Sequence, residues 1–128
     1  EGEHDGYARL PDPVRHRRIL DLDGPAGELV IRDDLDARGT HKIAIHFHLS
    51  ERCRLLRIES GTVEIVADGR KILLGMDPRL ELQTFSGNDE PIGGWVSRGY
   101  HHKSPSATVV GRAVINGNDS FLCRVRFA

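Results

Sequence analysis

The sequence predicts an all-β protein, a single antiparallel two-sheet β-sandwich of roughly 9–11 strands with little helix. Apolar residues alternate with period two in four segments, turn-forming residues separate nearly all the strand-like runs, and no window shows a convincing helical period. A chain of 128 residues is also of ordinary single-domain size. We therefore expect residues 1–128 to form one domain around one core.

The clearest alternation lies in residues 41–49, where Ile43 and Ile45 share one face and His46 and His48 share the other. The same period recurs in three further segments, at residues 62–67, 79–85 and 121–127. Six less regular runs complete the expected strands, at residues 16–22, 28–35, 53–58, 70–74, 95–97 and 108–115. The last run is apolar on both faces, which predicts a central strand.

Turn chemistry predicts two hairpins. Asp68-Gly69 lies between two apolar runs and suits a type I′ turn, which needs positive φ at both central residues. Residues 116–119 are expected to close a final hairpin in the same way. Residues 86–94 and 98–106 are predicted to be irregular loops, the part of a rigid sandwich where function tends to lie.

Composition limits the partners. Eighteen Lys and Arg residues face nineteen Asp and Glu residues, for a formal net charge of -1, so a general nucleic-acid binder is not expected. No apolar run is long enough to cross a membrane, and the N-terminus lacks the pattern of a signal peptide. We therefore expect a soluble chain with neither nucleic acid nor membrane as partner.

Two further features bear on origin. The chain begins at Glu1 instead of Met, which suggests a piece of a longer protein. Cys53 and Cys123 lie in strand-like runs without metal-site spacing, which predicts two buried free thiols. A single long-range disulfide is the alternative, and it would indicate an exported protein.

The strand around His46 and His48 contains an HxH pattern that could grip one metal ion if a third ligand lay close. A solvated strand face carrying two histidines is the competing interpretation. Together with the segment from Gly61 to Gly69, the HxH invites comparison with a cupin-like metal-binding β-barrel, although Glu51 follows too soon after His48 for that motif. Four residues could supply the third ligand: His4, Glu51, His101 and His102.

Two segments near the N-terminus combine chemistry-bearing residues. His4-Asp5-Gly6-Tyr7 holds the ingredients of an acid-base site, although neighbours on an extended chain mostly point in opposite directions. The alternative is a terminal segment anchored by Tyr7. The second is the basic cluster of Arg15, Arg17 and Arg18, which could bind carboxylate or sulfate groups or form salt bridges with nearby Asp residues on a charged edge strand.

The segment from Gly93 to Lys103 is the best candidate for a binding surface. It gathers the single Trp, one of the two Tyr and two His among glycines. Aromatic rings beside polar groups commonly stack on sugars and hydrogen-bond to them, whereas a packed loop that plugs one end of the sandwich is the alternative. The residues predicted to bind substrate are Arg15, Arg17, Arg18, Trp95, Arg98, Tyr100, His101 and His102.

Several of these segments, in order along the chain, resemble the C-terminal part of heparinase II/III-like polysaccharide lyases. The resemblance is carried by HDGYARL (residues 4–10), HRR (16–18), LVIRDDL (29–35), HFHL (46–49), GWVSRGY (94–100) and KSPS (103–106). It spans nearly the whole chain.

The resemblance implies a large bacterial parent, in which an α-helical toroid joined to a β-sandwich degrades acidic, uronate-containing polysaccharide by β-elimination. It also implies that the catalytic residues and the zinc ligands come from upstream segments, so no histidine of this chain is assigned a catalytic role or a zinc ligand. The expected role is structural, packing against upstream domains and lining the substrate cleft, in a parent compatible with a periplasmic or exported location. A carbohydrate-binding module for acidic glycans is the alternative from the class of binding proteins. On either hypothesis we expect no catalytic residue and no cofactor in this fragment.

Overall fold

The computed structural model describes all 128 residues and contains fourteen strands and no helix. Seven strands form one antiparallel sheet in the order β1-β2-β3-β14-β7-β6-β5. In that order they are β1 (Gly2–Tyr7), β2 (Val14–Asp23), β3 (Glu28–Asp36), β14 (Asp119–Phe127), β7 (Arg70–Gly75), β6 (Thr62–Ala67) and β5 (Cys53–Glu59). The all-β prediction is confirmed, and the chain forms no helix that could span a bilayer.

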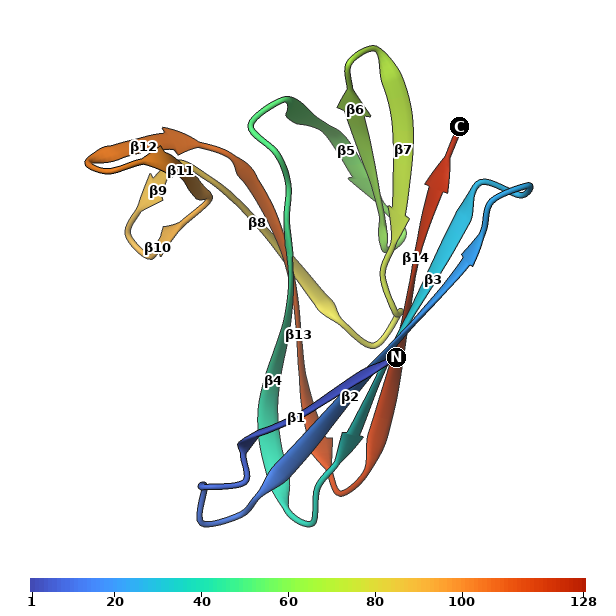
Figure 1. Cartoon of the computed structure of the whole chain (residues 1–128), viewed down its shortest axis with the longest axis vertical. Coiled ribbons are helices and arrows are strands. Elements are labelled where there is room, and N and C mark those ends of the chain that lie inside the picture. The colour runs from blue at the N-terminus through green and yellow to red at the C-terminus, as the bar shows by residue number, and fades with distance from the viewer.

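The second sheet has three strands in the order β4-β13-β8 and faces the large sheet (Figure 1). Two short hairpins, β10-β9 and β11-β12, project from it between β8 and β13. These strands are β4 (Thr40–His48), β8 (Glu81–Ser86), β9 (Asn88–Asp89), β10 (Ile92–Gly93), β11 (Trp95–Gly99), β12 (His102–Pro105) and β13 (Ala107–Asn116). The two main sheets do not join into a barrel, so the cupin-like barrel is wrong.

The core lies between the two sheets. Val63, Leu74 and Phe121 point inward from the large sheet and are at most 2% exposed. Ile45 and Val109 meet them from the small sheet. Because each sheet buries only one face there, apolar and polar residues alternate along the strands, as β4 was predicted to do. The central position predicted for β13 is also confirmed, since it pairs with β4 and β8.

One predicted hairpin is confirmed and the other is wrong. Asp68 and Gly69 both have positive φ, 50° and 77°, and join the paired strands β6 and β7 as a type I′ turn would. The turn from Asn116 to Asp119 instead carries the chain from β13 in one sheet to β14 in the other. The segment between β3 and β4 also passes from the large sheet to the small one. The Gly117 amide donates to the Gly39 carbonyl in that segment, so a hydrogen bond joins the two connections between the sheets.

Four strands lie outside the predicted ones. β1 was expected only as a terminal segment, and β9, β10 and β12 fall within the predicted loops. β1 and β12 are exposed along their whole length, so no one-sided burial imprints an alternation on them. The two cysteines are free thiols, with Cys123 buried and Cys53 half-buried. Burial raises the pKa of the Cys123 thiol.

Candidate functional site

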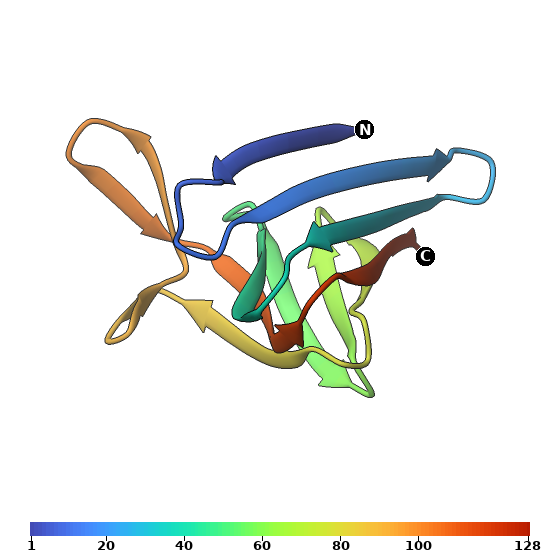
Figure 2. The same ribbon diagram turned by 90° about the horizontal axis from the view of Figure 1, so that it is seen from below.

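The β11–β12 hairpin stands clear of both main sheets (Figures 1 and 2). Trp95 pairs with Pro105 at its base and Gly99 with His102 near its tip. The turn between the strands consists of Tyr100, whose side chain is 88% exposed, and His101, which adopts a φ of 60°. The tip therefore presents an aromatic ring and an imidazole to solvent, with ring centroids 4.0 Å apart.

Gly94 anchors the base of this hairpin. Its carbonyl accepts hydrogen bonds from the amides of Gly87 and Ser106, both at 2.8 Å. Gly87 follows β8 and Ser106 precedes β13, so these bonds hold together the two points where the chain leaves and re-enters the small sheet. Its φ of +74° suits glycine, and an added Cβ would lie only 2.6 Å from backbone atoms of Phe85 and Ser86. Glycine is therefore required here on both conformational and steric grounds.

The side chain of Trp95 makes two contacts at the base of the hairpin. Its indole N–H donates to the Asn88 carbonyl at 2.8 Å, so the ring is fixed at its polar end. The Lys103 ammonium lies 3.9 Å from the ring centroid, a cation–π contact, and 3.6 Å from the Asp89 carboxylate. Lys103 remains more than half exposed and Trp95 is half-buried, so the ammonium is the more accessible of the two groups.

Arg98 is committed to a partner, unlike the groups at the tip. Its guanidinium makes a two-pronged contact with the Glu51 carboxylate, at 2.8 and 2.7 Å. These hydrogen bonds are the main cause that lowers the pKa of Glu51 to about 2. The pair ties the hairpin to the β4–β5 connection, which makes Arg98 a positioning residue for the hairpin.

Because of the Arg98–Glu51 pair, we expect the stability of the protein to depend on pH. Because the folded pKa of Glu51 is lowered, its contribution to stability is fully present above about pH 4.5 and is lost as the pH falls toward 2. We expect Arg98→Ala to raise the pKa of Glu51 toward its ordinary value, as measured by NMR titration of the carboxyl carbon. The matched control is Arg57→Ala, which removes an arginine paired with Glu64 and leaves Glu51 untouched. An unchanged Glu51 pKa in the Arg98 variant would contradict this assignment.

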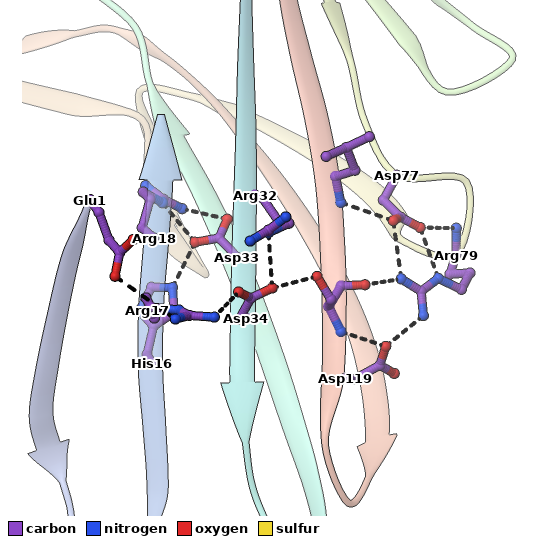
Figure 3. A network of polar contacts seen from close by, with 12 residues as sticks. Glu1, His16, Arg17, Arg18, Arg32, Asp33, Asp34, Asp77, Arg79 and Asp119 are labelled. Carbon is purple, nitrogen blue, oxygen red and sulfur yellow. Dashed lines mark hydrogen bonds and ion pairs between the residues drawn. The ribbon is translucent and has the colours of Figure 1, made fainter. Parts of the chain in front are cut away.

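The basic cluster of β2 divides between the two faces of the large sheet. Arg15 and Arg17 lie on the outer face, where Arg15 lies 3.6 Å from Glu3 and Arg17 donates to Asp34 at 2.9 Å. Arg18 lies on the inner face, as alternation along a strand requires. Figure 3 shows carboxylates facing the arginines of both faces. The predicted salt bridges with nearby Asp residues are present.

Asp33 is the centre of the inner-face network and is only 2% exposed. Its carboxylate accepts from the Arg18 guanidinium at 2.7 and 2.9 Å and from Nε2 of His16 at 2.6 Å (Figure 3). The bond to Asp33 is also the main cause that raises the pKa of Arg18. Sequence reasoning did not single out Asp33, although a carboxylate at an inward position between Ile31 and Leu35 is the signal that marks it.

His4 extends this network into a chain of hydrogen bonds that fixes the ring tautomers. The Gly6 amide donates to Nδ1 of His4 at 3.2 Å, so a neutral His4 carries its hydrogen on Nε2. Nε2 lies 3.1 Å from Nδ1 of His16 and donates to it, and His16 in turn donates from Nε2 to Asp33. Both nitrogens of His4 thus have partners within the protein, and no hydrogen bond joins His4 to Tyr7.

A third cluster forms where β14 begins. The Arg79 guanidinium bonds the carboxylates of Asp77, at 3.0 and 3.1 Å, and of Asp119, at 2.7 Å, and also the Ser120 carbonyl (Figure 3). It lies 4.4 Å from the ring centroid of Phe121. This cluster fastens the turn before β8 to the large sheet and leaves no charge uncommitted.

A cavity of about 410 Å³ lies between β4 and the β2–β3 side of the large sheet. Its polar lining includes His16, Arg18 and Asp33, which bond to one another, and His41, which bonds Asp12 at 2.8 Å. No buried side-chain nitrogen or oxygen of the chain lacks a partner. His16, Arg18, Asp33 and His41 in this cavity therefore have partners within the protein.

The predicted site residues fall into separate places. The arginines of β2 lie on the large sheet, whereas Trp95, Tyr100, His101 and His102 lie on the hairpin, and no hydrogen bond or ion pair joins the two groups. The imidazoles of His46 and His48 stack with centroids 5.7 Å apart, and nowhere do three or more His, Cys, Asp or Glu groups gather as metal ligands would. Burial, the nearby His48 and Arg112 lower the pKa of His46.

Comparison with known families decides the affiliation. The family model described as "Heparinase II/III-like, C-terminal" matches residues 1–126. The chain belongs to this family. No curated protein sequence matches the chain. The affiliation confirms the resemblance carried by the sequence motifs and makes the sandwich a polysaccharide lyase-related domain.

Proposed function

We propose that this heparinase II/III-like C-terminal domain is a non-catalytic wall of a polysaccharide lyase, and that the β11–β12 hairpin lines the cleft for an acidic, uronate-containing polysaccharide. One observation carries the proposal. The hairpin combines the exposed ring of Tyr100 and the half-buried ring of Trp95 with the exposed ammonium of Lys103, on a base fixed by hydrogen bonds. Rings of this kind stack on sugar faces, and a cation pairs with a uronate carboxylate.

The electrostatics of the remaining surface support this choice. A glycan carboxylate that approached Arg17 or Arg18 would have to displace a protein carboxylate held at 2.9 or 2.7 Å, closer than the 3.6 Å that separates Lys103 from Asp89. Such a displacement gains little, because one ion pair replaces another. In the whole lyase, a base supplied by another segment would remove the proton α to the uronate carboxylate, and the glycosidic oxygen would leave.

The alternative is an independent carbohydrate-binding module that grips acidic glycan through the arginines of β2 as well as the hairpin. Variants separate the two hypotheses. Calorimetric titration with a polyuronate such as alginate, together with Trp95 fluorescence, is expected to show weak saturable binding. Tyr100→Ala combined with Lys103→Ala is expected to weaken binding by about tenfold, the effect of losing roughly 1.4 kcal/mol from one stacked ring and one charge contact.

The matched control is Arg15→Ala combined with Arg17→Ala, which also removes exposed positive charge. On the cleft-wall proposal this variant binds as the unaltered chain does, whereas a module that uses both surfaces loses affinity. Absence of any heat and of any fluorescence change would refute the hairpin as a glycan surface. The same mixtures are expected to show no rise in the ultraviolet absorbance of unsaturated uronate, the product of β-elimination.

A further inference from the structure

The outer face of the small sheet, which points away from the large sheet, is basic. Ile45 on β4 packs in the core, so by alternation the even-numbered residues of β4 point outward. Arg112 on β13 pairs with Ala44 and therefore lies on the same face. The exposed basic residues that make up this basic face are Lys42, His46, His48 and Arg112. The strands that hold the two chain termini, β1 and β14, belong to the other sheet.

The two permanent charges of the basic face are unpaired. Neither the Lys42 ammonium nor the Arg112 guanidinium forms an ion pair, in contrast to the arginines of β2. Arg112 donates instead to the side-chain oxygen of Gln83, a neutral acceptor, at 2.9 Å. The one carboxylate among the outward residues of the three strands is Glu81, which lies opposite Arg112 without an ion pair. A carboxylate that binds Lys42 or Arg112 therefore displaces no carboxylate of the protein.

A groove of about 540 Å³ adjoins the basic face. Lys42 and Arg112 both line it, together with Ala44, which pairs with Arg112 and lies two residues from Lys42 on the same face. The small side chain of Ala44 leaves space beside the two cations. The remaining charged residues of the lining are Glu81, Arg79 and Asp119, of which the last two pair with each other. The groove thus presents two uncommitted cations to an acidic ligand.

The basic face leads toward the β11–β12 hairpin. β4 ends at His48, and Glu51 in the connection that follows bonds Arg98 of the hairpin. Figure 1 shows the hairpin extending from this end of the small sheet, on the side away from the large sheet. His48 bonds Thr108 through Nδ1 at 3.2 Å, which leaves its Nε2 open to a ligand. From His48 to Lys42 the strand covers six residues, about 20 Å.

We propose that the basic face is a second contact surface for the polyuronate that the hairpin holds. Arg112 and Lys42 pair with carboxylates of the glycan, and the imidazoles of His46 and His48 hydrogen-bond to its hydroxyl groups. The inference rests on the proposed function, because the hairpin holds another part of the same glycan. A uronate disaccharide is too short to reach from the hairpin to Lys42, whereas an octasaccharide spans the distance. Glycan length therefore decides whether the basic face contributes to binding.

Calorimetric titration with a uronate disaccharide and a uronate octasaccharide tests the proposal. The octasaccharide is expected to bind the unaltered chain more tightly than the disaccharide does. Lys42→Gln combined with Arg112→Gln is expected to weaken octasaccharide binding about fivefold, the effect of two exposed ion pairs, and to leave disaccharide binding unchanged. Glu81→Gln is expected to strengthen octasaccharide binding about twofold, because it removes a like charge beside Arg112.

The matched control is Arg54→Gln combined with Arg70→Gln, which removes two exposed cations without ion pairs from the large sheet. Equal weakening by the two arginine-containing double variants would overturn the proposal, and so would equal affinity of the two oligouronates.

The same titrations distinguish the basic face from the hairpin. Octasaccharide affinity that falls only in the variant with Tyr100→Ala and Lys103→Ala would overturn the basic face and retain the hairpin. Affinity that falls only in the variant with Lys42→Gln and Arg112→Gln would refute the hairpin and retain the basic face. NMR shifts of the amides of residues 42–48 that are as large with an oligothymidylate as with the octasaccharide would overturn the assignment to acidic glycan.

Discussion

Replacing Asp33 with alanine is expected to lower the free energy of unfolding by about 3 kcal/mol, as measured by urea denaturation. The carboxylate is buried and is shared by the guanidinium of Arg18 and the imidazole of His16. Its loss leaves the guanidinium and the imidazole without this partner at the margin of the core, which costs more than the bonds themselves contribute. The variant also releases the link from His16 to His4, so β1 is expected to lose hydrogen-exchange protection.

The matched control is Asp34→Ala, one residue along β3 and on the opposite face. Asp34 also bonds an arginine, Arg17, but its carboxylate is better exposed, and water can replace it. We expect a loss of about 1 kcal/mol or less for this variant. Equal losses at Asp33 and Asp34 would contradict the claim that burial of the inner-face network makes it critical.

Replacing Gly94 with alanine is expected to destabilise the protein by about 3 kcal/mol and to weaken polyuronate binding. A left-handed φ costs a residue with a Cβ roughly 1 kcal/mol, and the clash with backbone atoms at 2.6 Å adds a further 1–3 kcal/mol. Relief of the clash requires the segment to shift, which breaks the hydrogen bonds from Gly87 and Ser106 to the Gly94 carbonyl. Thermal denaturation and the polyuronate titration measure the two effects.

Gly69→Ala supplies the control for the conformational part of this cost. Gly69 has a similar φ of +77°, but an added Cβ there meets nothing within 4 Å. Its alanine variant should therefore lose only about 1 kcal/mol and keep the glycan affinity of the unaltered chain. If the Gly94 and Gly69 variants lost the same stability, steric closure at the hairpin base would be disproved.

The parts of the fold that could be predicted are those where one-sided burial acts on each residue in turn. In β4, Ile43 and Ile45 face the core while His46 and His48 face outward, so the strand follows directly from the alternation. No such constraint acts on β1 or β12, whose residues are all exposed, and there the sequence lacks the pattern. The turn after Asn116 illustrates a second limit. Turn residues specify a reversal of the chain, but long-range pairing decides which sheet the next strand joins.

In the candidate site, too, local strand geometry could be predicted, whereas contacts between strands could not. The split of Arg15 and Arg17 from Arg18 follows from strand geometry alone, and so was open to prediction. The pairing of these arginines with particular carboxylates could not be predicted, because Asp33 and Asp34 approach β2 from the neighbouring strand β3. The hairpin was predicted as a binding segment from its composition, whereas its anchoring through Gly94 depends on contacts with β8 that no local pattern encodes.

On the proposed function, the hairpin meets acidic glycan and the arginines of β2 do not. NMR titration of the isotope-labelled chain with a uronate oligosaccharide tests it most directly. We expect saturable shifts of the amides within residues 95–103 and of the Trp95 indole N–H, while the amides of residues 15–18 stay in place. Shifts centred on residues 15–18, or a hairpin unmoved at saturating oligosaccharide, would contradict it.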